Sequence, residues 1–120
     1  MTPEEHLLKA AEDVAEHGHA KDYYFDTGGK RVAWSTAPSC ALGSIARAGD
    51  LCNEAGLVMG EVIADNHPTA RLLADHLREK YPHLAMKSPD NYSLITTFND
   101  DKNTTGEDVI LAMKEAAHHG

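Results

Sequence analysis

Cys40 is the residue best suited to nucleophilic chemistry in this sequence. It stands at the expected start of a helix, where the positive end of the helix dipole lowers the pKa of a thiol and favours the thiolate. With His67 or His76 as the base and Asp100 to orient that base, this thiol could serve a cysteine-dependent hydrolase or transferase. The alternative, which we favour, is that Cys40 is a small buried apolar residue at a tight helix contact.

The spacing of cysteines and histidines indicates no metal site, and we predict neither a metal nor another cofactor. Cys40 and Cys52 do not form a C-x-x-C pair. If one helix joined them they would lie about 18 Å apart, farther than the about 7 Å that a disulfide allows. The eight histidines lack the H-E-x-x-H spacing that places two ligands on one helical face. His118 and His119 are expected at a frayed, solvated end.

Tyr23, Tyr24 and Trp34 are the candidates for contact with a protein partner. Exposed, they would form an interaction hot spot, because tyrosine and tryptophan dominate the energetics of interfaces. Buried, they would hold their segment against the rest of the chain, which is the interpretation we favour. All three lie near residues 21–34, where two runs of strand-forming residues flank residues 26–29. Because the residues between the runs tolerate positive φ, the segment predicts a β-hairpin packed on helices.

The first half of the chain otherwise has helical patterns. A capping box that begins at Thr2 predicts a first helix, which ends at Gly18. Ser39 is expected to cap a second helix that pauses near Gly49. Within this second helix, Gly43 would let a neighbouring backbone approach closely.

The second half of the chain is also expected to be mostly helical. The apolar pattern of residues 51–64 favours a helix, despite two glycines that would interrupt it. A further helix is predicted from Pro68 to the stop at Tyr81. Residues 92–98 have helical spacing, with a strand as the alternative because several of them are β-branched. A second capping box, at Thr105, predicts the last helix.

Length and charge exclude several classes of protein. The chain has 120 residues, which predicts one domain over residues 1–120. No apolar run approaches the about 20 residues of a membrane span, and the N-terminal segment is acidic where a signal peptide would be basic. We therefore expect a cytoplasmic protein without a membrane partner. The 11 basic and 19 acidic residues give a net charge of −8, which disfavours nucleic acid as a partner.

Three short motifs have a recognisable combination. They are C-A-L-G-S-I at residues 40–45, F-N-D at 98–100 and T-x-E-D-V-I at 105–110. Together they resemble the pattern C-A-L-G-[AS]-I, W-N-D and T-x-E-[DE]-V of a family of small uncharacterised proteins from actinobacteria and their bacteriophages, classed as a domain of unknown function. Phe98 stands where that family more often has tryptophan. The resemblance implies no activity, cofactor or site.

The physical roles of these motif residues favour a scaffold over a catalytic site. Asn99 and Asp100 are expected to end one element and begin a turn, with side chains that bond the backbone two residues on. Cys40 and Gly43 would start a helix against a close neighbour.

We therefore predict an α-dominated (α+β) domain of about four to six helices with one hairpin. By resemblance, it would be an accessory protein of an actinobacterium or phage, in the host cytoplasm in the second case, that binds an unidentified protein and alters its activity without catalysis. The alternatives are the enzyme that uses Cys40 and a DNA-mimicking inhibitor, in which the carboxylates would be ordered on one surface. A homodimer also stays open, because an apolar patch can pair two copies.

Overall fold

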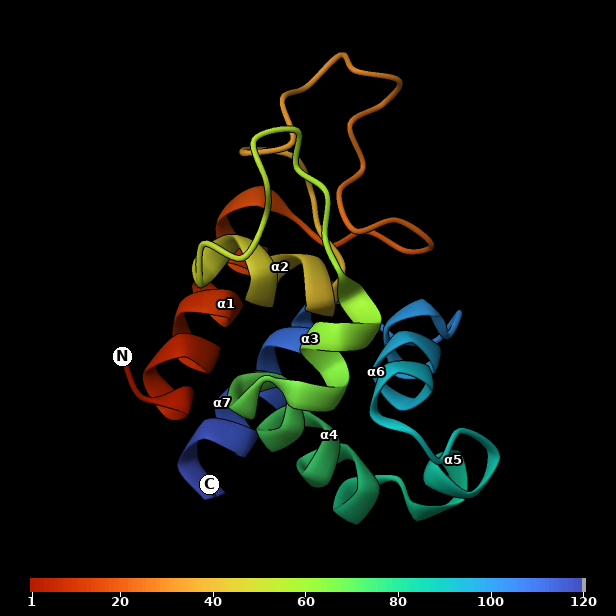
Figure 1. The fold of residues 1–120 in the computed structure, drawn as a ribbon. Helices are drawn as coiled ribbons and strands as arrows, with labels where there is room; N and C mark the ends of the chain where they lie inside the picture. The colour runs from red at the N-terminus through yellow and green to blue at the C-terminus, as the bar shows by residue number, and fades with distance from the viewer. Residues whose placement is uncertain (120) are drawn as a thin grey trace.

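The computed structural model describes residues 1–119. Within this range, every element of secondary structure longer than an isolated bridge is a helix. The helices of this range, shown in Figure 1, are α1 (Pro3–His17), α2 (Ala41–Ala48), α3 (Gly60–Asn66), α4 (Pro68–Lys80), α5 (Pro82–Lys87), α6 (Asn91–Asp100) and α7 (Gly106–His119). The α-dominated prediction is confirmed, although the described range has seven helices where four to six were expected. None of these described helices combines the length and the apolar character needed to cross a membrane.

The first and fourth helices organise the bundle. α1 packs against α7, α2 and α4, while α4 also packs against α7, α6 and α3. The largest fully buried apolar side chains are Leu7, Leu42, Ile45, Leu73, Leu77, Leu94, Ile95, Met113 and Val109. Because each buried side chain of this size stabilises the fold by about 1.5–3 kcal/mol, these shared faces hold the helices together.

Several predicted helix ends are confirmed by their hydrogen bonds. The Thr2 hydroxyl accepts a bond from the Glu5 amide at 3.1 Å, and α1 ends at Gly18, which has a φ of 99°. Before α7, the amide of Thr105 donates to the Asp108 carboxylate at 2.9 Å, and the Asp108 amide donates back to the threonine hydroxyl at 3.2 Å. α4 also begins at the predicted proline and stops before the predicted tyrosine.

The predicted cap of α2 is wrong by one residue. Cys40 is the N-cap, and its sulfur accepts a bond from the Gly43 amide at 3.3 Å. The Ser39 hydroxyl is directed instead toward Asp13, at 3.5 Å. A thiol is a weak acceptor, so sequence preferences for N-caps favour the serine.

The predicted helix over residues 51–64 is also wrong in its first part, where residues 49–59 form a loop. The Asn53 side chain accepts bonds from the amides of Ala55 and Leu57, both at 2.9 Å. Gly56 has a φ of 79°, which an α-helix does not allow. These two features turn the chain away from a helical path until α3 begins.

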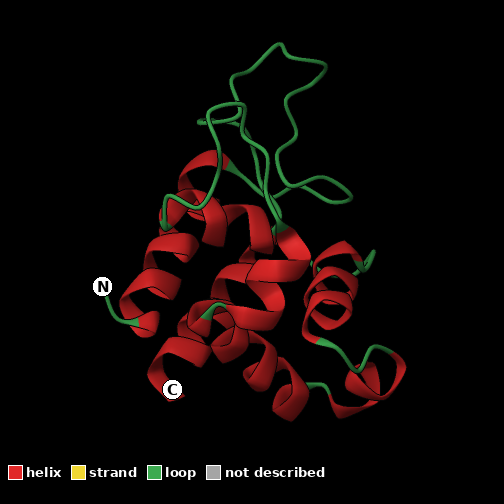
Figure 2. Cartoon of the chain, viewed as in Figure 1, coloured by secondary structure: helices red, strands yellow, loops and turns green. Residues whose placement is uncertain are grey.

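The β-hairpin predicted near residues 21–34 is not formed. The start of this region instead meets Ser39, through isolated bridges that His19 and Phe25 form with that residue. Positive φ values at each of residues 28–30 replace the two-residue turn that would align the two runs. The runs therefore separate, and residues 18–40 form a long loop that projects from the same end of the bundle as residues 49–59 (Figure 2).

Arg47 fixes the outer part of this long loop. Its Nε donates to Asp13 Oδ2 at 2.8 Å, and a second nitrogen of the guanidinium bonds the other oxygen of that carboxylate. Its remaining terminal nitrogen donates to the carbonyls of Trp34 and Ala37 at 2.6 and 2.8 Å. The guanidinium also lies 4.8 Å from the centre of the Phe25 ring. Arg47 thus anchors the loop to the bundle, because it is itself held by an ion pair between α2 and Asp13 of α1.

Asn99 fixes the inner part of the loop. This side chain, only 1% exposed, has a partner for each of its hydrogen-bonding positions. Its Oδ1 accepts from the Ala41 amide at 2.9 Å and pairs with His19 Nε2 at 2.8 Å. Its Nδ2 donates to the Ala20 carbonyl at 3.0 Å and to Asp100 Oδ1 at 2.9 Å. The expectation that Asn99 bonds the backbone two residues on is therefore wrong.

We expect Asn99→Ala to lower the free energy of unfolding by about 2–4 kcal/mol, because it leaves a buried amide and a buried carbonyl without partners. Urea unfolding followed by circular dichroism measures this loss. Asn103→Ala is the control, since Asn103 is exposed and the change should stay within about 0.5 kcal/mol. Equal effects of the two substitutions would contradict the structural role of Asn99.

Candidate functional site

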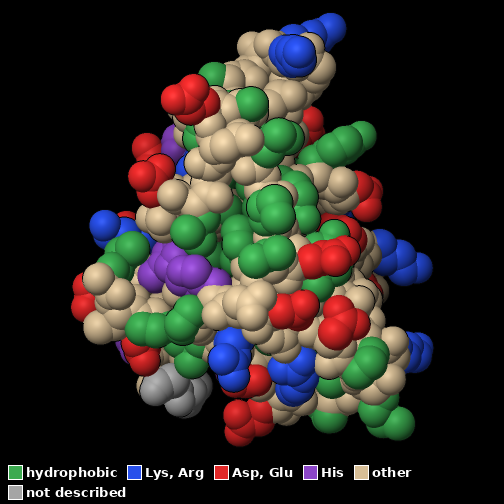
Figure 3. Space-filling model, in the orientation of Figure 1, with side chains coloured by type: hydrophobic (Ala, Val, Ile, Leu, Met, Phe, Trp, Pro, Cys, Tyr) green, Lys and Arg blue, Asp and Glu red, His purple; other side chains and the backbone are tan. Residues whose placement is uncertain are grey.

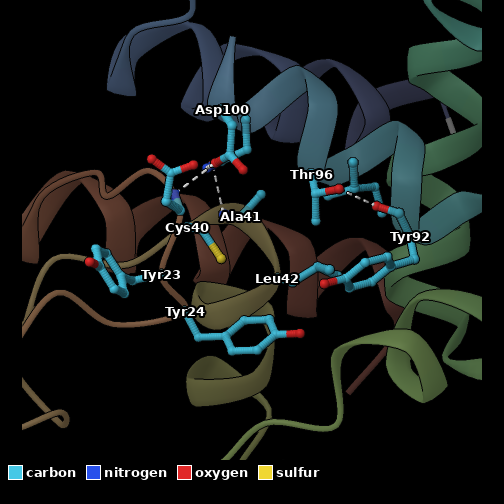
Figure 4. Close-up of a pocket in the computed structure, with 11 residues that line it drawn as sticks. Tyr23, Tyr24, Cys40, Ala41, Leu42, Tyr92, Thr96 and Asp100 are labelled. Atoms are coloured by element: carbon cyan, nitrogen blue, oxygen red, sulfur yellow. Dashed lines mark hydrogen bonds between the residues drawn. The ribbon is translucent and has the colours of Figure 1, made fainter. Parts of the chain in front are cut away.

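A pocket of about 350 Å³ lies where the long loop, the start of α2 and the face of α6 meet (Figure 4). Its volume is within the range of about 300–1,000 Å³ typical of ligand sites. The lining residues are Asp22, Tyr23, Tyr24, Cys40, Ala41, Leu42, Tyr92, Ile95, Thr96, Asn99 and Asp100. It therefore gathers two of the sequence-predicted partner-binding residues, the predicted nucleophile and the Asp100 carboxylate.

Cys40 lies in the lining of this pocket, with its side chain buried. The residue is 7% exposed, and burial raises the pKa of its thiol to about 11, with a smaller increase from the negative charge of Asp100. The bond from the Gly43 amide acts in the opposite direction but does not overcome burial. The start of a helix lowers the pKa of a thiol, but here the increase in pKa caused by desolvation is larger.

The histidines considered as bases for Cys40 do not line the pocket. His67 lies edge-on to His6, with ring centroids 5.1 Å apart, and its Nδ1 accepts the Thr69 amide at 3.3 Å. His76 Nε2 lies 3.4 Å from a carboxylate oxygen of Glu115, between α4 and α7. Within the described residues, no three His, Cys, Asp or Glu side chains are grouped so that they could hold a metal.

Two glycines determine where Tyr24 can lie. The Tyr24 carbonyl accepts the Cys40 amide at 3.1 Å, and a Cβ atom on Gly43 would stand only 2.2 Å from the same carbonyl oxygen. A Cβ atom on Gly60, at the start of α3, would stand 1.9 Å from the Tyr24 hydroxyl. The close approach predicted for Gly43 is thus confirmed. Burial and the neighbouring Tyr92 hydroxyl raise the pKa of the Tyr24 phenol well above its ordinary value.

A second hollow adjoins the pocket and shares two of its tyrosines. It is lined by Tyr24, Tyr92 and the α3 start, including Met59 and Val62. Tyr23, Met59 and Val62 are 64%, 68% and 51% exposed. We use the name tyrosine groove for the surface formed by Tyr23, Tyr24, Met59, Val62 and Tyr92. Figure 3 shows hydrophobic side chains gathered on this face, where the loops meet α2 and α3, with acidic side chains at their border.

Trp34 lies apart from the tyrosine groove. Its ring centroid is 5.5 Å from that of Phe25, and its indole N–H donates to the Glu54 carbonyl at 3.3 Å. A Cβ atom on Gly56 would meet the indole at 2.4 Å. This partly buried residue joins the two projecting loops, while Tyr23 and Tyr24 face the groove.

Sequence reasoning missed Tyr92, Met59 and Val62 as site residues. Tyr92 has the helical spacing of a core position, and Met59 lies in a segment where a helix was expected. Gly43 and Gly60 leave room for Tyr24, which allows the long loop to lie against α2 and α3 beside these residues. A contact between segments so distant along the chain has no signal in local spacing.

We expect the two glycines that position Tyr24 to respond differently to alanine. Gly60→Ala should destabilise the chain by about 1–3 kcal/mol through overpacking, but should become neutral or stabilising in a Tyr24→Ala background, where the obstructing ring is gone. Gly43→Ala should remain destabilising in both backgrounds, because its clash is with backbone. Thermal unfolding of the four variants and their parents measures both effects. Rescue of both glycine changes by Tyr24→Ala would contradict this geometry.

We expect native Cys40 to resist alkylation. With a pKa of about 11, about one thiol in a thousand is ionised at pH 8, and the sulfur is buried. Iodoacetamide at pH 8 should therefore modify the half-buried Cys52 first and Cys40 only in urea, as peptide mass spectrometry would show. A Cys52→Ser chain is the control for Cys40 alone. Faster labelling of Cys40 than Cys52 in the folded chain would revive the nucleophile hypothesis.

Comparison with known proteins gives a family but no activity. A model described as a family of unknown function, DUF6197, matches residues 1–119. No match was found among curated proteins or among solved structures. The matched range includes the tyrosine groove, Asn99 and both capping boxes, so it covers the elements that build the site. The chain therefore belongs to DUF6197, a family of unknown function.

Proposed function

We propose that this chain is a protein-binding module whose docking surface is the tyrosine groove. The observation that carries the proposal is the exposure of Tyr23, Met59 and Val62 around two adjoining hollows. Tyrosine supplies a large contact area with few rotatable bonds, and methionine adapts to irregular apolar partners. Such a cluster on one face favours a partner with apolar anchor residues.

The segments that carry the groove support the same proposal. A loop as long as residues 18–40 without helix or strand is uncommon, and loops of that length are usually functional or disordered. This loop is held at both ends of its path, by Arg47 outside and by Asn99 inside. A surface already fixed in place loses less conformational entropy when a partner binds.

Charge favours a basic partner. Asp22 and Asp100 line the pocket, Glu61 lines the neighbouring hollow, and the chain has a net charge of −8. The partner segment that we propose is therefore a peptide with apolar anchors and a net positive charge. Opposite charges on the two partners would raise the association rate and disfavour acidic competitors.

The binding role fits the groove better than the alternatives do. The protonated, buried thiol of Cys40 supports packing, not catalysis. A DNA mimic needs ordered carboxylates, whereas hydrophobic side chains occupy the centre of the face shown in Figure 3. An accessory role in the cytoplasm, in which binding alters the activity of the partner, is the form of function that we propose.

Selection of peptides from a random 12-residue display library tests the docking surface. We expect selected peptides to bind the wild-type chain and to lose about tenfold or more in affinity on Met59→Glu or Val62→Glu, as for hot-spot residues. Met86→Glu and Leu111→Glu are matched controls, because these residues are 84% and 51% exposed on α5 and α7. Isothermal titration calorimetry measures the affinities.

Two results would overturn the proposal. One is peptide binding that survives both groove substitutions, which would place the docking surface elsewhere. The other is a stable homodimer in sedimentation that Met59→Glu dissociates, which would make a second copy of this chain the occupant of the groove.

A further inference from the structure

We propose that the pocket beside Cys40 receives an arginine side chain of the bound partner, with the guanidinium between the tyrosines and the two carboxylates. This inference rests on the proposed function, since the pocket is one end of the tyrosine groove. It assigns an arginine side chain of the partner to that end of the groove, whereas the second hollow would receive apolar side chains of the same partner.

The lining of the pocket has the composition of a cation site. It contains the carboxylates of Asp22 and Asp100, and it contains no lysine, arginine or histidine. Figure 4 shows Asp100 on one side of the space, with Tyr23, Tyr24 and Tyr92 around the others. A guanidinium is planar, stacks on aromatic faces and binds carboxylates through paired N–H groups, so it matches both parts of this lining.

The carboxylate of Asp100 is held in place while keeping acceptor capacity. Asp100 Oδ1 accepts the Asp22 amide at 3.0 Å and Asn99 Nδ2 at 2.9 Å. Both of these bonds use the same oxygen, which leaves Oδ2 of Asp100 for a ligand. Asp22 is an exposed residue of the lining with a backbone φ of 67°, and its amide is the donor of the bond to Asp100.

The start of α2, which also borders the pocket, does not convert it into an anion site. The positive end of a helix attracts anions through amides that lack a partner. Here the Ala41 amide is bonded to Asn99, and the Gly43 amide is bonded to the Cys40 sulfur. The nearby ammonium of Lys21 donates to the Asp101 carbonyl at 2.6 Å, and Lys21 is not part of the lining.

Three matched peptides test the assignment: acetyl-Leu-Arg-Leu-amide, its citrulline counterpart and its lysine counterpart. Citrulline has nearly the shape of arginine without the charge. In ¹⁵N NMR titrations at low salt, we expect the arginine peptide to bind about fivefold or more tightly than the citrulline peptide, the ratio typical of one partly exposed ion pair. The shifted amides should include those of Tyr23, Ala41 and Thr96. The lysine peptide should bind more weakly than the arginine peptide, because ammonium cannot stack or form paired bonds.

Asp22→Asn provides the matched variant. Asparagine tolerates the positive φ at this position, so the loop should keep its conformation, as the spectrum of the free variant would show. We expect the variant to lose about fivefold in affinity for the arginine peptide and to bind the citrulline peptide as before. Asp65→Asn, an equal change of charge at an exposed residue of α3, should alter neither affinity.

The outcomes separate this inference from the proposed function. Equal binding of the arginine and citrulline peptides, or shifts confined to residues outside the pocket, would overturn the arginine assignment. Selected library peptides that still depend on Met59 and Val62 would then leave the docking surface intact. The opposite result is also possible to distinguish. If the arginine peptide binds as expected but the library peptides keep their affinity for the Met59→Glu and Val62→Glu variants, the arginine pocket is supported and the wider docking surface is overturned.

Discussion

The buried amide of Asn99 is the interaction on which the position of the long loop and the pocket depends. One oxygen and one nitrogen connect α6 to the start of α2, to the carbonyl of Ala20 and to the ring of His19. A side chain with both a donor and an acceptor group is required, because a carboxylate could not donate to a carbonyl and an aliphatic side chain would leave each partner unsatisfied in a buried position. Asp100, the next residue, continues the network to the pocket entrance at Asp22.

The tyrosine groove is the product of two kinds of constraint that act on one loop. Polar anchors at Asn99 and Arg47 fix the path of the loop, while the absence of side chains at Gly43 and Gly60 lets Tyr24 reach the bundle. The result is an aromatic surface in which Tyr23 is exposed, while Tyr24 and Tyr92 are partly buried against the core. Because its shape is set by buried contacts, the groove would lose little conformational entropy on binding the partner that we propose.

Local chemistry was sufficient to predict much of the helical framework but little of the site. Capping boxes at Thr2 and Thr105 correctly predicted α1 and α7, because cap hydrogen bonds join residues only three apart. The hairpin prediction failed because the start of that segment pairs with Ser39, while the preceding Ala20 carbonyl bonds the Asn99 side chain far along the chain. The local turn role predicted for Asn99 was also wrong, because most of its hydrogen-bond partners lie far from it along the chain. The groove joins the long loop, the start of α3 and α6, so no single stretch of sequence contains its pattern.

The packing of α1 against α7 also has a consequence for the order of events in folding. The first helix buries its apolar face on the last, so the largest helix contact closes a loop that spans nearly the whole chain. Contacts of this separation are slow to form, because chain entropy is lost before they contribute. During synthesis, the apolar face of α1 stays uncovered by α7 until α7 has left the ribosome. Until α7 is made, the growing chain therefore exposes apolar surface of α1 that the folded structure buries.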